Sequence, residues 1–234
     1  MKKKWSILGL ASALLLSVAM TVSVGFTAAD AENEITFSNN DYAVSDSYEV
    51  RLTYNSDNEL LTAKNGLRYK VTIPKTQYAE LAKANGDTVT VKYGALVAPK
   101  SYTLENPLNY ENVFGADRVY STSAAQEADD EAASKPTRRI RQFETAEMIE
   151  DGENCYRYFT VDNLDAEGVV ANYVIKAYIA KYTVGDNGAV TDSEYYFADG
   201  EKEMNMSYAV QKALEADKIG EKYVEDVKKV YVEG

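Results

Sequence analysis

The stretch TVGDNGAVTDSE, from Thr183 to Glu194, is the part of the sequence that comes nearest to a metal-binding motif. Gly188, Val190 and Glu194 fall where an EF-hand calcium loop has its glycine, an apolar residue and its last carboxylate. The first and third positions of such a loop need oxygen ligands, but Thr183 and Gly185 stand there. Because two charged ligands are missing, the sequence predicts no metal site.

The same stretch fits the turn of a β-hairpin. Asn187-Gly188 is the pair that a two-residue type I′ turn prefers, because both of its central residues need a positive φ. A turn centred on this pair sets the cross-strand neighbours, which are Lys181 with Glu194, Ile179 with Tyr196, and Tyr178 with Phe197. One opposite-charge pair and two apolar pairs favour a hairpin over a calcium loop.

The chain has few residues of the types that carry out other catalytic chemistry, because it has no histidine and Cys155 is its single cysteine. A Ser-His-Asp arrangement needs histidine, and a zinc site usually needs histidine or several cysteines. We expect Cys155 to be a buried thiol that packs as a small apolar residue. A pair of carboxylates could hydrolyse a glycoside, but no spacing distinguishes one pair among the many acids. The sequence therefore predicts a protein without catalytic activity, cofactor or metal.

The N-terminus has the three parts of an export signal: Lys2 to Lys4, an apolar run from Trp5 to Phe26, and Ala29-Asp30-Ala31. We expect cleavage after Ala31. The alternative is a retained membrane anchor, because about 20 apolar residues can span a bilayer. Cleavage removes three Lys and one Asp, which leaves 22 basic and 36 acidic residues and a net charge of about −14. Such a surface repels nucleic acid and anionic membranes, so we predict a secreted or cell-surface protein that contacts a membrane only through an uncleaved N-terminal segment.

Periodicity predicts the elements that position these residues. Alternation of apolar and polar residues predicts strands within 48–54, 66–74, 88–99, 155–161, 169–184 and 193–197. Helices are predicted near 76–85 and, from apolar stripes at helical spacing, over 206–214 and 221–232. The pattern indicates an α+β fold dominated by strands, with an antiparallel β-sandwich-like core, one short internal helix and two C-terminal helices.

The chain divides into four parts on this basis. They are a signal peptide, residues 1–31; a polar segment with one strand, 32–64; a β-rich core module, 65–216; and a C-terminal amphipathic helix, 217–234. Residues 121–135 are rich in alanine and acids, so we expect a mobile acidic insertion there. Arg138, Arg139 and Arg141 follow it, and we expect them to pair with Asp129, Asp130 and Glu131; the alternative is a docking patch.

Several segments resemble a module that recurs in secreted and surface proteins of gut clostridia. They are GLRYKV (66–71), KYGALVAP (92–99), YRYFTVDNL (156–164), NYVIKAYIAKY (172–182) and SYAVQKALE (207–215). Members commonly have an arginine just before the serine that opens the helix, where this chain has Met206. The resemblance covers about residues 60–216 and implies an extracellular location, but it implies no activity and no site residues.

Tyrosine is the residue type best suited to binding here, with 19 in the chain. Both faces of the predicted hairpin are apolar, so we expect a second sheet on one face and the terminal helices on the other. The alternative is that the face with Tyr178, Tyr182 and Tyr195 is open, which makes these three residues the candidate ligand-binding residues. We predict a secreted, non-catalytic module that binds an extracellular protein or glycan through tyrosine-rich faces. The alternatives are a structural component of the cell envelope and a carboxylate-based glycoside hydrolase.

Overall fold

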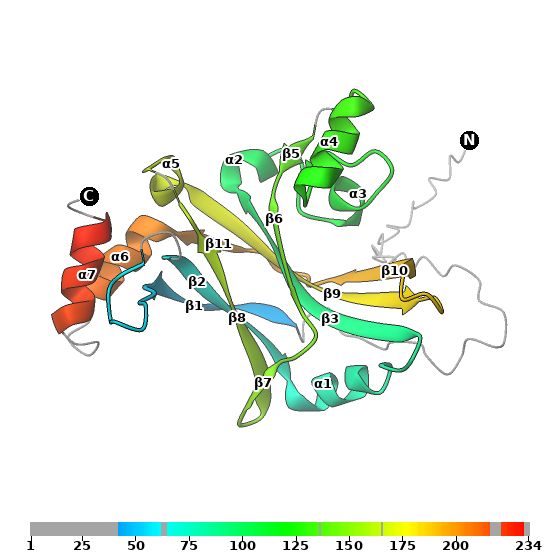
Figure 1. Ribbon diagram of the computed structural model, residues 1–234, viewed down its shortest axis with the longest axis horizontal. Coiled ribbons are helices and arrows are strands. Elements are labelled where there is room, and N and C mark those ends of the chain that lie inside the picture. The colour runs from blue at the N-terminus through cyan, green and yellow to red at the C-terminus, as the bar shows by residue number, and fades with distance from the viewer. Residues whose placement is uncertain (1–41, 62–64, 136, 165, 216–220, 232–234) are drawn as a thin grey trace, which may run out of the picture. The chain divides into compact units, whose positions relative to one another are not determined.

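A computed structural model describes residues 42–231, apart from 62–64, 136, 165 and 216–220 (Figure 1). The predicted signal peptide and its cleavage site after Ala31 lie outside the described residues. Within the described part of the chain, no helix combines the length and the apolar composition that a membrane span requires.

Sheet one contains four antiparallel strands in the order β1-β2-β8-β7. The strands are β1 (Ala43–Arg51), β2 (Gly66–Pro74), β7 (Ile149–Asp151) and β8 (Asn154–Asp162). The alternation predicted for β2 is confirmed, since Leu67, Tyr69, Val71 and Ile73 are all fully buried. Burying one such side chain contributes about 1.5–3 kcal/mol, so this face of β2 is a main source of stability.

Sheet two contains four strands in the order β10-β9-β3-β6, and a fifth strand, β11, also pairs with β9. The strands are β3 (Val89–Pro99), β6 (Arg141–Thr145), β9 (Asn172–Val184), β10 (Val190–Phe197) and β11 (Lys202–Asn205). All of these pairs are antiparallel. The 13-residue β9 is long enough to pair with β11 along its first part and with β10 along its second.

The inner faces of the two sheets form one hydrophobic core. Ile175, Ala177 and Ile179 of sheet two belong to the same buried cluster as the inward side chains of β2. Helices α1 (Lys75–Ala82), α6 (Met206–Glu215) and α7 (Glu221–Tyr231) add buried residues to this cluster, among them Leu81, Met206 and Val227. The predicted strand-dominated α+β fold is confirmed, with the short helix α1 and two C-terminal helices. The prediction of a single internal helix is wrong, because four further short helices lie between β3 and β9.

The outer face of sheet two is covered by the segment from Lys100 to Ile140, on the side away from sheet one (Figure 1). This segment contains α2 (Lys100–Thr103), α3 (Tyr110–Val113), β4 (Tyr120–Ser121), α4 (Ala124–Ala132) and β5 (Arg138–Arg139). A short helix, α5 (Ala166–Val170), precedes β9. Both hairpin faces are therefore covered as predicted, but the terminal helices are not the second cover. They pack near sheet one instead, where the Tyr223 hydroxyl donates to the Val50 carbonyl at 2.7 Å.

The acidic stretch at 121–135 forms α4, a regular helix, where the sequence predicted a mobile insertion. Ser123 begins the helix, and its hydroxyl accepts a bond from the Gln126 amide at 3.1 Å. Asp130 is only 2% exposed and forms two bonds with the guanidinium of Arg118, at 2.6 and 3.2 Å. A buried carboxylate needs such a partner, so α4 is fixed to the preceding segment.

The ion pairs predicted for the three following arginines are wrong. Arg139 lies 3.8 Å from Glu127, and Arg141 pairs with Asp162 at 2.9 Å. The guanidinium of Arg138 lies over the ring of Tyr102, 5.1 Å from its centroid. These arginines therefore contact groups that the fold brings close to them, and none of the three pairs with the acidic residues predicted from the sequence.

The hairpin of β9 and β10 has the predicted register but a different turn. Lys181, Ile179 and Tyr178 face Glu194, Tyr196 and Phe197 as expected. Gly188 has a positive φ of 76°, whereas Asn187 does not, so the turn is not type I′. The Gly188 main-chain N–H donates to the Gly185 carbonyl at 2.8 Å, and the Gly185 N–H donates to the Ala189 carbonyl at 2.9 Å. These bonds leave a three-residue loop between Gly185 and Ala189. An irregularity between Val190 and Asp192 then restores the predicted register.

Candidate functional site

An open groove lies on the outer face of sheet two, next to the covering segment. Its volume is about 610 Å³, within the range of small-molecule sites. Its lining combines aromatic and polar side chains, which are Phe114, Thr122, Ser123, Gln126, Gln142, Glu144, Tyr182 and Tyr195. We call this site the aromatic groove. Two of the three predicted tyrosines, Tyr182 and Tyr195, line it.

The aromatic side of the groove is built from the hairpin and from Phe114, the residue that follows α3. The rings of Phe114 and Tyr195 stack with centroids 3.8 Å apart and planes within 11°. Tyr182 meets Tyr195 edge-on, at 6.1 Å and 88°. Tyr110, which is 44% exposed, lies 6.2 Å from Tyr195 and extends the aromatic surface outward. Two perpendicular rings with a stacked third ring give a rigid apolar corner.

The polar side of the groove centres on Glu144. Its Oε1 accepts bonds from the Tyr182 hydroxyl at 2.6 Å, the Tyr178 hydroxyl at 2.8 Å and the Gln142 amide at 3.0 Å. Its Oε2 lies 3.6 Å from Lys92 Nζ, which is an ion pair but is beyond hydrogen-bond distance. One carboxylate oxygen is therefore saturated by the protein, while the other keeps capacity to accept a bond from a ligand.

The two tyrosine hydroxyls act as hydrogen-bond donors and stay protonated. Burial raises the pKa of Tyr178 well above its usual value, and the nearby Glu144 carboxylate adds to the effect. Burial also raises the pKa of Tyr182, with further contributions from its bonds to Glu144 and Tyr195. Neither hydroxyl can therefore serve as a base near neutral pH, and both hold the Glu144 carboxylate in place.

Gly94 makes this arrangement possible. On the middle strand β3 it lies between Tyr178 of β9 and Glu144 of β6 in the cross-strand register. A Cβ at Gly94 would lie 2.5 Å from Tyr178 Cζ and 2.7 Å from the Phe143 carbonyl oxygen. The absence of a side chain lets the Tyr178 ring cross β3 so that its hydroxyl reaches Glu144.

The prediction of exposed tyrosines needs correction for Tyr178, which is completely buried. Tyr182 and Tyr195 are half-buried. The structure does bring all three together, since the rings of Tyr178 and Tyr195 are 5.9 Å apart. Tyr178 thus supports the groove from below and does not line it.

The pattern of the sequence did not mark Phe114, Gln142 or Glu144 as site residues. The stretch RQFET at 141–145 alternates, which puts Gln142 and Glu144 on one face and Phe143 on the other, and this signal was available. Phe114 carried no such signal, because its place depends on how the covering segment folds back over the sheet.

Metal-binding and thiol chemistry receive little support from the described residues. No group of three or more His, Cys, Asp or Glu side chains in that part of the chain lies close enough together to hold a metal. Cys155 is buried, and burial raises the pKa of its thiol. No protein-family model, curated protein or solved structure matches the chain.

Proposed function

We propose that this protein is a secreted or cell-surface binding module that holds a neutral glycan in the aromatic groove without transforming it. The observation that carries this proposal is the corner of Tyr182 and Tyr195 next to the Glu144 carboxylate. The resemblance to the clostridial module stays a prediction, and it agrees with an extracellular role.

A sugar ring matches both sides of the groove. Its C–H faces are apolar enough to stack on a half-buried tyrosine ring, and its hydroxyls donate hydrogen bonds to a carboxylate. Glu144 Oε2 has that capacity, because its nearest positive group, Lys92 Nζ, is 3.6 Å away. A neutral ligand fits better than an acidic one, since Glu144 would repel a second carboxylate.

The number of carboxylates in the groove supports binding without catalysis. Glycoside hydrolysis usually needs two carboxyl groups, about 5–10 Å apart. Glu144 is the one carboxylate among the described residues that line the groove. Its Oε1 is occupied by three donors, which suits a fixed acceptor better than a group that exchanges protons.

Affinity gel electrophoresis with soluble β-glucans, xylans, mannans and galactans tests the proposal. We expect one of these polysaccharides to retard the protein, and we expect Tyr195→Ala to reduce the retardation at least tenfold, since stacking on Tyr195 is lost. The matched control is Tyr158→Ala, which removes another partly exposed tyrosine, in β8, outside the groove. Equal loss in both variants, or unchanged retardation in Tyr195→Ala, would refute the groove as the site.

Affinity electrophoresis together with light scattering tests the structural alternative. A component of an envelope assembly would bind none of the glycans and would show a mass above that of the monomer in light scattering. That pair of results would replace the binding proposal with the assembly hypothesis.

A further inference from the structure

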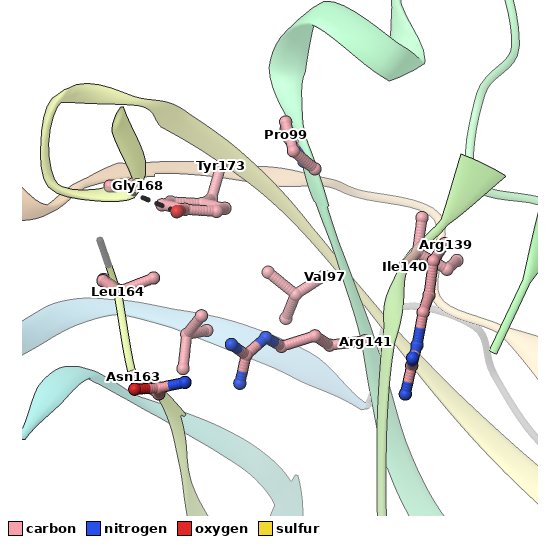
Figure 2. Close-up of a pocket in the computed structure, with 10 residues that line it drawn as sticks. Val97, Pro99, Arg139, Ile140, Arg141, Asn163, Leu164, Gly168 and Tyr173 are labelled. Carbon is pink, nitrogen blue, oxygen red and sulfur yellow. Dashed lines mark hydrogen bonds between the residues drawn. The ribbon is translucent and has the colours of Figure 1, made fainter. Parts of the chain in front are cut away.

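A second pocket lies at the seam between the two sheets (Figure 2). Its residues come from the end of β3, from β5 and the start of β6, from the end of β8 and the residues that follow it, from α5 and from the start of β9. Its volume is about 220 Å³. We call it the seam pocket; it shares no lining residue with the aromatic groove.

The floor of the seam pocket is apolar. Val97, Val161 and Tyr173 line it and are at most 6% exposed, and Leu164 lines it at half-burial. The polar end of Tyr173 is already used, because its hydroxyl donates to the Gly168 carbonyl at 2.9 Å (Figure 2). This floor therefore offers a surface for a hydrocarbon group and no hydroxyl chemistry.

The mouth of the pocket is polar, since Arg139, Arg141 and Asn163 also line the pocket. Figure 2 shows the Arg141 side chain extending from β6 toward Asn163. Nη1 donates to the Asp162 carboxylate at 2.9 Å, and Nη2 donates to the Asp162 main-chain carbonyl at 2.8 Å. The two bonds use two of the five N–H groups of a guanidinium and fix its position. Arg141 thus holds a positive charge next to the apolar floor of the pocket.

We propose that the seam pocket binds a short aliphatic carboxylate, with its tail against Val97, Val161 and Leu164 and its carboxylate on the Arg141 guanidinium. A guanidinium fork matches a carboxylate in both charge and geometry. The cavity is smaller than the roughly 300–1,000 Å³ of most small-molecule sites, so a short chain fits and a large ligand does not.

Asp162 gives this proposal a sharp consequence. Its carboxylate occupies the guanidinium that the ligand would use, so it competes with the ligand's own carboxylate. Its main-chain carbonyl would still hold Nη2 if the side chain lost its charge. Removing that charge should therefore strengthen binding, whereas removing Arg141 should weaken it.

Methyl NMR of the purified protein during titration with sodium butyrate and sodium hexanoate tests the proposal. We expect saturable shifts of the Val97, Val161 and Leu164 methyl signals, while Ile73, which is buried elsewhere in the core, does not shift. Butyramide has the same tail without the charge and should produce no shift at equal concentration. The absence of shifts with both acids, or equal shifts with butyramide, would overturn the proposal.

Three variants locate the carboxylate. Arg141→Gln should weaken butyrate binding by about tenfold or more, because a charge-assisted bond is lost. Asp162→Asn should tighten it severalfold, and Lys83→Gln, which changes an exposed cation that follows α1 and pairs with Glu80, should leave it unchanged. Unchanged binding in Arg141→Gln, or binding to Asp162→Asn no tighter than to the wild type, would overturn Arg141 as the anchor. Arg141 and Asp162 are both about half-exposed, so these variants are expected to fold.

Discussion

The two faces of sheet two bury tyrosines in opposite ways. On the inner face, Tyr93 is 1% exposed and its hydroxyl has no hydrogen-bond partner among the described residues. On the outer face, Tyr178 is equally buried, but its hydroxyl accepts a bond from Gln142 at 2.7 Å and donates to Glu144 at 2.8 Å. Burial alone therefore does not identify a tyrosine that supports a site. The hydrogen-bond network around the buried hydroxyl identifies it.

The difference has a physical consequence for each face. The inner face is held by shape and apolar area, so its tyrosine hydroxyl adds little or carries a cost. The outer face is held by a network in which each partner satisfies another, so its members depend on one another. Substitutions that act on one face and not on the other test this contrast.

The largest effect is expected at Gly94, where any side chain would disturb the outer face. Gly94→Ala places a Cβ 2.5 Å from the Tyr178 ring and 2.7 Å from a main-chain oxygen, and the backbone atom cannot easily move. We expect the free energy of unfolding to fall by about 2–3 kcal/mol in urea denaturation. Gly86→Ala is the control, because a Cβ there meets no atom within 4 Å. Equal small effects at both glycines would contradict the packing argument.

The next effect compares the two buried tyrosines directly. Tyr178→Phe removes the bond that Gln142 donates to the hydroxyl and the bond that the hydroxyl donates to Glu144, so we expect a loss of about 1–2 kcal/mol in the free energy of unfolding. Tyr93→Phe removes a hydroxyl without a described partner, so we expect a change of less than about 0.5 kcal/mol, or a gain. Thermal and urea unfolding of both variants measure the difference. Similar losses in the two proteins would show that the faces do not differ as argued.

The core between the two sheets, which includes the inner face of sheet two, could be predicted from the sequence because its signal is local. Residues 66–74 alternate without interruption, and every apolar residue of that pattern is buried. The hairpin register also followed from local pairing, since Glu194 lies across from Lys181. In these places the residues that specify the structure are neighbours in sequence or across a single turn.

The outer face could not be predicted in the same way, because its signals join distant segments. Phe114 reaches Tyr195 only when the covering segment folds back, and Asp130 is buried only because Arg118 meets it. A stretch rich in alanine and acid is typical of both exposed chain and helix, and capping by Ser123 decided for the helix. Gly94 was the available clue, since glycine inside a strand pattern often marks a close approach.

A smaller effect is expected in the turn that joins the two strands of the hairpin. Gly188 needs its positive φ of 76°, so Gly188→Ala should lower the free energy of unfolding by about 1 kcal/mol. Asn187→Ala should cost less than about 0.5 kcal/mol, because it removes an exposed bond to the Ala189 amide but requires no left-handed backbone. Chemical unfolding of the two variants checks this. Equal losses of about 1 kcal/mol would favour a type I′ turn instead.

The smallest effect is expected at Glu194, the residue that a calcium loop would have used as its last ligand. Burial opposes its charge, but bonds from Tyr196 at 2.6 Å and Lys181 at 3.0 Å outweigh this and lower its pKa. A lowered folded-state pKa stabilises the protein above the unfolded-state value of about 4.3, and this stabilisation is lost as pH falls through the folded-state value. The pair is partly exposed, so its contribution is small.

Glu194→Gln should therefore lower the free energy of unfolding by roughly 0.5 kcal/mol at pH 7. The difference from the wild type should shrink as the pH falls below about 4.3 and through the lowered folded-state pKa, because the wild-type carboxyl then becomes protonated. Urea denaturation over a series of pH values from 7 downward, with calcium and with chelator, measures this. If the difference persists at low pH, where the Glu194 carboxyl has lost its charge, the effect of the substitution comes from packing. Calcium could instead raise the melting temperature of the wild type and not that of Glu194→Gln. That result would show that the hairpin binds metal at Glu194, and the comparison of the two faces would then have to include a bound ligand.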